Sequence, residues 1–180
     1  RPIGQVSDRL KAAVVMSEDG QFCRHWGVDF SALRAEIDKM LAGRAFRGAS
    51  TIPMQVARNL FLWNAPSFLR KGLEVPLALY LDLVLSKRRI MEIYLNVAEW
   101  GPNGEFGVEA GAQAAFGIDA DALTWERASL LAVTLPNPLL RRPGNPTSGL
   151  RRIADVVAER AKQYGQRAGC VAASGELSLE

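Results

Sequence analysis

Apolar residues recur along most of this chain at spacings of three and four, which is the period of an amphipathic α-helix. The clearest example is the segment 30–41, where Phe30, Leu33, Ile37 and Leu41 follow this spacing. The same pattern predicts further helices over about 52–62, 108–116, 124–134 and 147–164. The sequence has no sustained β-type alternation and no internal repeat. It therefore predicts a mainly α fold in one domain, with one or two lobes.

Local signals mark where other helices begin and end. Ser7 precedes the first apolar stretch and is a candidate N-cap. A long helical stretch is expected from about 67–98, with Pro76 as a kink and Ser86 as a restart. Residues 166–180 are small and polar, so we expect a poorly ordered C-terminal tail.

Composition narrows the class of protein. The 180 residues are 48% hydrophobic and 23% charged, which is usual for a globular fold with a sizeable core. The net charge of +3 favours an anionic partner, without choosing between nucleic acid, phospholipid and pyrophosphate. Cys23, Cys170 and a single histidine do not form the pattern of a disulfide framework or a zinc site, and they leave the redox compartment open. The sequence has no apolar run of about 18 residues, and its start at Arg1 is interpreted as a fragment or a processed form.

Two adjacent carboxylates, Glu18 and Asp19, follow an apolar run and stand shortly before the only histidine, His25. At a helix C-terminus the helix dipole disfavours a charged carboxylate, and desolvation by apolar surface does the same. Both effects raise a carboxyl pKa and favour a proton acceptor near neutral pH. Solvated charges at a helix end would give the same sequence, so the pair alone does not choose between the two interpretations.

A second stretch combines a glycine loop with the hydroxyls of Ser50 and Thr51, either of which can cap the helix that follows. Backbone N–H groups at a helix start bind anions. Gln55 lies three residues before Arg58 and four before Asn59, so these side chains share a helix face. The alternative is an ordinary capped amphipathic helix.

Two further stretches carry cations. Arg70 and Lys71 lie four and three residues before Glu74, which fits either a surface ion pair or a carboxylate that is held among cations to orient a substrate or a metal. Lys87 opens a run of cations at a helix start, where the helix dipole does not favour them. An anionic ligand bound there would offset this unfavourable interaction with the dipole. An ordinary solvated turn would give the same sequence pattern.

A fifth stretch is apolar and aromatic. Residues 60–63 are followed closely by Phe68 and Leu69, and together they exceed what one helix face needs. They can form core, or they can dip into a membrane surface beside the neighbouring cations.

In their order and spacing, these stretches closely resemble the motifs of the peptidoglycan glycosyltransferases, specifically the monofunctional biosynthetic transglycosylases of bacterial cell walls. The resemblance covers about residues 6–165. The matching positions are Glu18, Asp19, Phe22, His25 and Gly27 in the first motif, 48–52 and Gln55 in the second, Arg70, Lys71 and Glu74 in the third, Lys87, Ile90, Glu92, Tyr94, Leu95 and Asn96 in the fourth, and 106–110, 116–117 and 135–138 beyond them.

The resemblance implies a lysozyme-like helical glycosyltransferase domain over residues 1–165. Its reaction would polymerise lipid II into β-1,4-linked glycan strands by inverting transfer, with undecaprenyl pyrophosphate as leaving group. Glu18 would be the general base that takes the proton of the acceptor hydroxyl. Glu74 would be the second catalytic glutamate, which orients cations around the pyrophosphate or holds a divalent cation, Mg²⁺ or Mn²⁺. His25 would be structural.

The resemblance also implies a substrate site and partners. The residues that would bind the pyrophosphate are Ser50, Gln55, Arg58, Asn59, Arg70, Lys71 and Lys87. The partners would be lipid II, the growing glycan strand, a membrane surface and other cell-wall synthesis proteins, and not nucleic acid. The domain would face the periplasm at the inner membrane, with the anchor outside this sequence.

Two positions depart from the family pattern. The usual pair of glutamines is Met54–Gln55 here, and Pro66 stands where many members carry an arginine. Each change removes one polar contact expected at the pyrophosphate. Two alternatives therefore stay open: a lysozyme-like wall-degrading enzyme, and a lipid II-binding scaffold domain with little activity.

Overall fold

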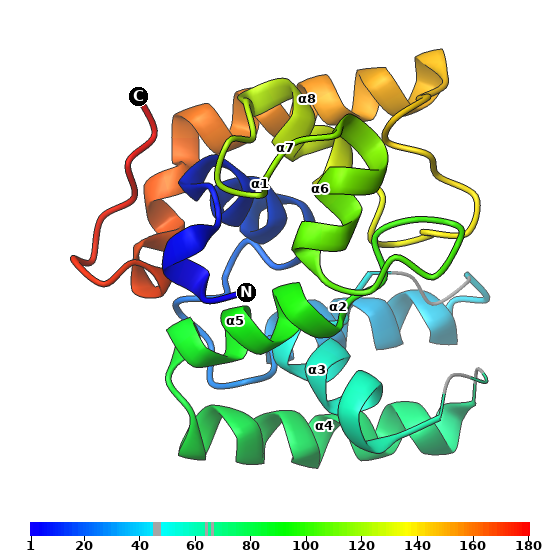
Figure 1. The fold of residues 1–180 in the computed structure, drawn as a ribbon. Coiled ribbons are helices and arrows are strands. Elements are labelled where there is room, and N and C mark those ends of the chain that lie inside the picture. The colour runs from blue at the N-terminus through cyan, green and yellow to red at the C-terminus, as the bar shows by residue number, and fades with distance from the viewer. Residues whose placement is uncertain (45–47, 64, 66) are drawn as a thin grey trace.

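The computed structural model describes residues 1–44, 48–63, 65 and 67–180, which form eight α-helices and two 3-10 helices (Figure 1). The elements are η1 (Ile3–Gln5), α1 (Asp8–Glu18), α2 (Phe30–Leu41), α3 (Ile52–Phe61), α4 (Phe68–Val84), α5 (Lys87–Val97), α6 (Val108–Phe116), α7 (Trp125–Ala132), α8 (Ser148–Tyr164) and η2 (Gly165–Val171). The described residues add only an isolated β-bridge between Glu99 and Phe106. The predicted mainly α fold is confirmed. No helix within this described part is long and apolar enough to cross a bilayer.

Side-chain caps set several of the predicted helix starts. Thr51 rather than Ser50 caps α3, because its hydroxyl oxygen accepts a hydrogen bond from the backbone N–H of Met54 at 3.3 Å. Ser86 caps α5 in the same way at 3.2 Å, so the expected restart occurs. Ser7 precedes α1 but donates its hydroxyl to a distant backbone carbonyl instead of capping the helix. Pro66 lies outside the described residues.

α1 lies at the centre of the core. Residues 10–15 are all buried, and the helix packs against α7, α8 and η2 (Figure 1). The fully buried rings of Tyr94 and Trp100 complete this core. Because α1 is enclosed along most of its length, its last residue, Glu18, is the one that reaches the edge of this group of helices.

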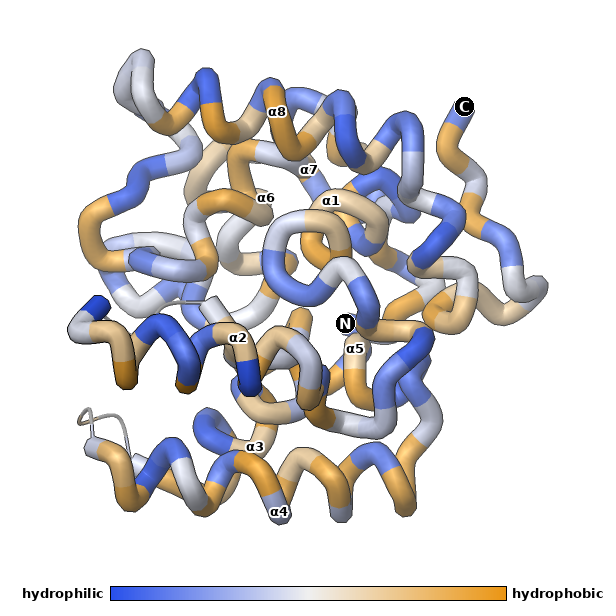
Figure 2. Tube along the Cα trace, turned by 180° about the vertical axis from the view of Figure 1, so that it is seen from behind, coloured by the Kyte–Doolittle hydropathy of each residue, from blue (hydrophilic) through white to orange (hydrophobic). Residues whose placement is uncertain are grey.

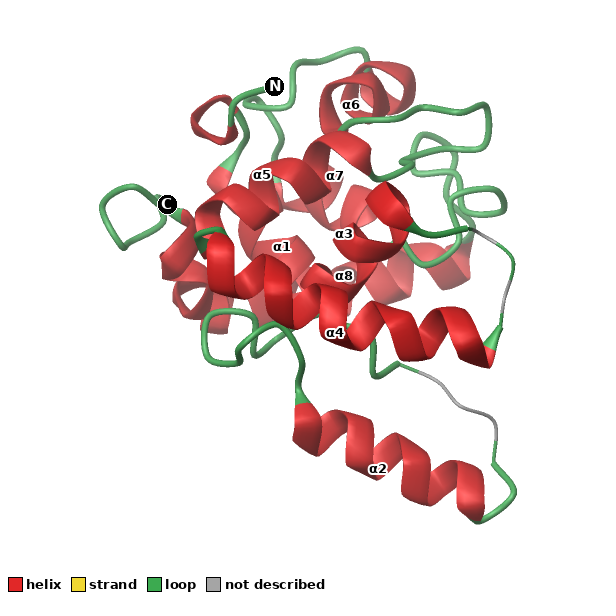
Figure 3. Ribbon diagram, turned by 90° about the horizontal axis from the view of Figure 1, so that it is seen from below, coloured by secondary structure: helices red, strands yellow, loops and turns green. Residues whose placement is uncertain are grey.

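A second group of helices, α3, α4 and α5, lies below α1. α4 packs against α3 and lies on the opposite side of the molecule from α8 in Figures 1 and 2. α5 packs against both α3 and η2, and so joins the two groups. α2 stands apart from the other helices in Figure 3, and the two ends of its predicted apolar stripe, Phe30 and Leu41, stay exposed.

The C-terminal segment is more structured than its composition indicates. We expected a poorly ordered tail over residues 166–180, but η2 occupies its first part and Leu177 is buried against the core. Gln166 holds the backbone of Leu177 through two hydrogen bonds, at 2.7 and 3.0 Å. A disulfide joins Cys170 to Cys23 across 147 residues of sequence. The tail is therefore tied covalently to the loop that follows α1, and by burial to the core.

Candidate active site

Glu18 is the last residue of α1 and its side chain is half-buried. Its carboxylate accepts hydrogen bonds from the Gln55 amide at 3.3 Å and from the Ser17 hydroxyl at 3.4 Å. Burial raises the pKa of Glu18, and the hydrogen bonds from Gln55 and Ser17 and the charge of Arg141 offset only part of that rise. A carboxyl group in this environment is suited to accept a proton near neutral pH.

Gln55 is held in place by Tyr94. The Tyr94 hydroxyl donates to the Gln55 side-chain oxygen at 3.1 Å, and this leaves the Gln55 NH₂ group directed at Glu18. Burial raises the pKa of Tyr94 well above its ordinary value, so the phenol stays a donor. The three side chains form a hydrogen-bonded chain that runs from α5 through α3 to α1, and we call this chain the relay. Tyr94 was matched to a motif by sequence but was not among the predicted site residues.

Asp19 has a different role from Glu18. Its two carboxylate oxygens lie 2.9 and 2.8 Å from Nε2 of His25, and one of them accepts the backbone N–H of Ile52 at 3.0 Å. A carboxylate at a helix start is favoured by the helix dipole. Asp19 therefore connects the start of α3 to the loop after α1, and His25 contacts it there.

The third motif forms a buried ion cluster at the start of α4. The Glu74 side chain is only 1% exposed, and its oxygens lie 3.2 Å from Arg70 Nε and 3.1 Å from Lys71 Nζ. Lys71 also donates to the hydroxyl of Ser50, while Arg70 donates to the backbone carbonyl of Ala65 at 2.8 Å. Three predicted binding residues and the second glutamate are thus brought together.

Other predicted residues are placed less directly. Lys87 Nζ donates to the His25 carbonyl at 2.7 Å, pairs with Asp82 at 2.8 Å, and lies 4.9 Å from the centre of the Phe22 ring. The Lys87 ammonium group therefore holds the loop after α1, through the His25 carbonyl and the Phe22 ring. Arg58 is half-exposed and close enough to Tyr94 to affect its pKa, and Asn59 is exposed.

Arg141 is a candidate that the sequence analysis missed. Its guanidinium donates to the Val133 carbonyl at 2.5 Å, and its positive charge lowers the pKa of Glu18. The sequence signal was present, because Arg141 closely follows the matched stretch 135–138. It lies on a loop, however, and only the fold brings that loop to the end of α1.

The described residues do not fit the divalent cation that the resemblance implied. They contain no group of three or more His, Cys, Asp or Glu side chains that could hold a metal. Glu74, the expected ligand, is already paired with two cations.

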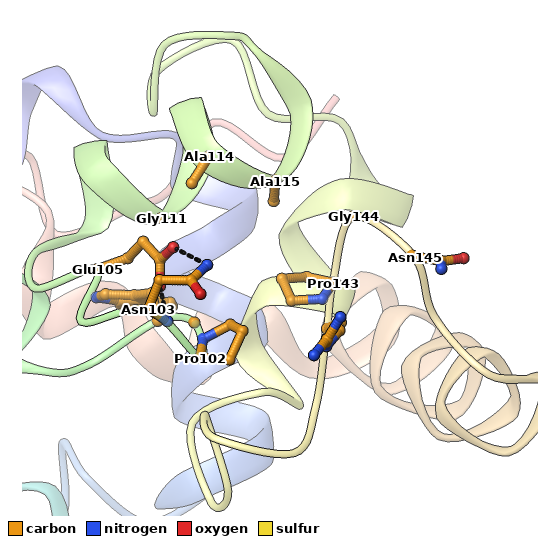
Figure 4. A pocket seen from close by; sticks show the side chains of 12 residues that line it. Pro102, Asn103, Glu105, Gly111, Ala114, Ala115, Pro143, Gly144 and Asn145 are labelled. Carbon is orange, nitrogen blue, oxygen red and sulfur yellow. Dashed lines mark hydrogen bonds between the residues drawn. The ribbon is translucent and has the colours of Figure 1, made fainter.

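Two concave surfaces bear on where a substrate binds. One, of about 400 Å³, is lined by Glu18 and its neighbours together with α8 and η2. The other, drawn in Figure 4, lies between the 101–105 loop, α6 and the 142–145 loop, with Asn103 bonded to Glu105 at 2.9 Å. None of the predicted site residues lines this second pocket. The candidate active site is therefore the surface around Glu18.

Comparison with known proteins places the chain in a family. The model of the transglycosylase family matches residues 1–162. The chain belongs to the transglycosylase family. Curated relatives described as biosynthetic peptidoglycan transglycosylases include those of Rhizobium etli (54% identical over 169 residues), Agrobacterium fabrum (55% over 170) and Mesorhizobium japonicum (56% over 170). Each alignment covers 94% of this chain, and 72%, 75% and 72% of the respective relative.

The transglycosylase domain is a lysozyme-like helical fold, so the expected fold class is confirmed. The match contains all four motifs quoted from the sequence and includes both glutamates. It ends within α8, before η2 and Cys170, whereas Cys23 lies inside it. The segment that closes onto the loop after Glu18 therefore lies outside the matched part of this transglycosylase.

Proposed function

We propose that this transglycosylase polymerises lipid II into β-1,4-linked glycan strands and releases undecaprenyl pyrophosphate, with Glu18 as general base. Glu18 carries the proposal, because it is a half-buried carboxylate with a raised pKa at the edge of the core and a fixed hydrogen-bond donor beside it. The 54–56% identity to biosynthetic peptidoglycan transglycosylases supports the same reaction.

In this mechanism Glu18 takes the proton of the acceptor sugar's 4-hydroxyl. The oxygen then attacks the anomeric carbon of the donor from the face opposite the pyrophosphate, and the C–O bond to the pyrophosphate breaks with inversion at that carbon. Gln55, fixed by Tyr94, keeps the carboxylate oriented toward the hydroxyl. Holding the reacting groups in line supplies much of the rate enhancement in such a reaction.

The departing pyrophosphate needs positive charge close to it. Lys71 and Arg70, together with the Ser50 hydroxyl, supply it at the start of α4, and Arg58 and Asn59 extend the surface from α3. Glu74 acts as a positioning residue, because its buried carboxylate holds both cations. Lys87 is also a positioning residue, because it holds the loop after Glu18 through a hydrogen bond to the backbone carbonyl of His25.

The lipid end of the substrate fits the apolar surface next to these cations. Phe68 and Leu69 are 84% and 70% exposed at the start of α4, and Phe61 and Trp63 are exposed at the end of α3. Figure 2 shows hydrophobic residues repeated along α4, on the side away from α8. We propose that this surface enters the outer leaflet of the inner membrane, with basic side chains at the headgroups.

A periplasmic site for the domain agrees with its disulfide. Disulfides persist in the periplasm and are rare in the cytosol, and Cys23 and Cys170 are joined in this chain. The partner molecules remain those expected from the family: lipid II, the glycan strand and other wall-synthesis proteins.

Labelled lipid II in detergent tests the proposal, with purified sacculi as a parallel substrate. We expect polymer and released undecaprenyl pyrophosphate from lipid II, and no soluble fragments from sacculi. Fragment release without polymer would favour the wall-degrading enzyme. Binding of lipid II with no turnover would favour the scaffold domain.

A further inference from the structure

The concave surface of about 400 Å³ beside Glu18 carries two arginines that the mechanism does not use. Arg160 and Tyr164 come from α8 and Arg167 from η2, and the opposite wall is the turn that contains Glu18. Tyr164 and both arginines are exposed to solvent. The surface thus presents two cations and one aromatic ring at the edge of the proposed reaction site.

These two arginines are not neutralised within the part of the chain that the structure describes. Neither forms an ion pair there, whereas the neighbouring Lys162 is paired with Glu159 at 2.7 Å. Arg167 is held by stacking, with its guanidinium carbon 4.6 Å from the centre of the Tyr164 ring. A stacked arginine keeps its hydrogen-bond donors free for a planar anion such as a carboxylate.

The position of Arg167 relative to Glu18 is fixed by the disulfide. Arg167 lies three residues before Cys170, and Cys23 lies five residues after Glu18. η2 also packs directly against α1. The cation is therefore part of the site, although it lies beyond the residues that match the family.

The chemistry of the ligand follows from the two sides of Glu18. On one side Gln55 leads to α3 and α4, where the cations and exposed apolar side chains take the pyrophosphate and the lipid. On the other side lies the arginine surface, toward α8, which is on the opposite side of the molecule from α4 (Figure 1). The part of the substrate that reaches α8 is thus the part away from the phosphates. In lipid II the anionic groups of that part are the free carboxylates of the peptide.

We propose that Arg160 and Arg167, with Tyr164, bind the peptide carboxylates of the sugar substrate positioned at Glu18. This inference rests on the proposed function and extends it, because it assigns the substrate's peptide to three side chains that belong to none of the motifs. The arginines are substrate-binding residues and take no part in the transfer of the proton.

The test uses the full chain and two substrates: lipid II, and lipid II whose peptide carboxyl groups are converted to amides. We expect the double variant Arg160→Gln and Arg167→Gln to lose about tenfold in kcat/KM on lipid II, chiefly through KM, because two solvent-exposed ion pairs to the substrate are lost together. On the amidated substrate, the double variant and the wild type should have nearly equal kcat/KM. Arg152→Gln, an exposed arginine on α8 that does not line this surface, is the matched control.

The outcomes separate the inference from the proposed function. An equal loss on both substrates would overturn the inference and indicate a general effect, such as binding to membrane lipid. No loss on either substrate would also overturn it. If the wild type polymerises neither substrate, the proposed function itself fails. Thermal melts of each variant show whether a loss comes from unfolding, and Tyr164→Leu, which removes the stacking surface, should then weaken lipid II binding in the same direction.

Discussion

Reducing the Cys23–Cys170 disulfide should destabilise the whole domain, because the bond closes most of the chain into one loop. The two cysteines are 147 residues apart in sequence. In the chain-entropy account, a cross-link across about 100 residues contributes about 4.7 kcal/mol, and the logarithmic dependence raises this to about 5 kcal/mol here. Losses of about 2–5 kcal/mol are typical when a native disulfide is removed, so we take that range as the expectation.

For a domain of this size, each kcal/mol corresponds to about 2–4 °C in melting temperature. Thermal melts with and without a thiol reductant should therefore differ by roughly 4–20 °C. Urea titration gives the free energy directly, and a slope that changes little on reduction would show that the same folded state is being compared. The double variant Cys23→Ser and Cys170→Ser is the control, because it should melt like the reduced wild type and ignore the reductant.

Reduction should also lower activity before it unfolds the protein. η2 is held against the loop after Glu18 by this bond. In the same loop Asp19 contacts His25 and accepts the backbone N–H of Ile52 at the start of α3. We expect a lower kcat at temperatures well below the melt. Oxidised and reduced protein that melt within about 1 °C of each other, with free thiols confirmed by alkylation, would refute this reasoning.

Changes at Tyr94, Glu74 and Glu18 test the roles given to these three side chains. Tyr94→Phe removes the donor to Gln55, so we expect kcat to fall several-fold with little change in KM, and stability to fall by about 1 kcal/mol in urea; an unchanged kcat would exclude the relay. Glu74→Gln removes the carboxylate that pairs with Arg70 and Lys71, so the free energy of unfolding measured in urea should fall by about 3 kcal/mol. The KM for lipid II should rise in this variant, and an unchanged KM would contradict the positioning role of Glu74. Burial raises the pKa of Glu18, and the general base must be ionised to accept a proton. A plot of log kcat/KM against pH should therefore rise through a pKa above that of an ordinary glutamate. A rise centred on the ordinary glutamate pKa would argue against Glu18 as the base. The same raised pKa means that ionised Glu18 opposes folding above that pKa, so Glu18→Gln should melt no lower than the wild type at pH 7.

Local signals in the sequence were enough to predict most of the helices. α2 begins and ends where the spacing of Phe30 through Leu41 placed it, and the restart at Ser86 occurs because its hydroxyl caps α5. The same local signals did not reveal which faces are covered. The apolar stripe of α2 predicted a helix correctly, yet Phe30 and Leu41 remain exposed.

What the sequence could not supply depends on contacts between distant residues. Spacing alone gave no reason to pair Cys23 with Cys170, and without that bond the C-terminal segment appeared to be a tail. Lys87 was expected at the pyrophosphate but is bonded to a loop 62 residues earlier. Arg141 reaches Glu18 only because the loop before α8 folds back to the end of α1.

The polymerisation rate of the Glu18→Gln variant on lipid II tests the central claim most directly. Glutamine keeps the size of the side chain but cannot accept the proton, so the account predicts no detectable polymer from a variant that melts at or above the wild-type temperature. The surface variant Glu159→Gln is the matched control and should polymerise at the wild-type rate. Substantial polymerisation by a folded Glu18→Gln protein would contradict the assignment of Glu18 as the base.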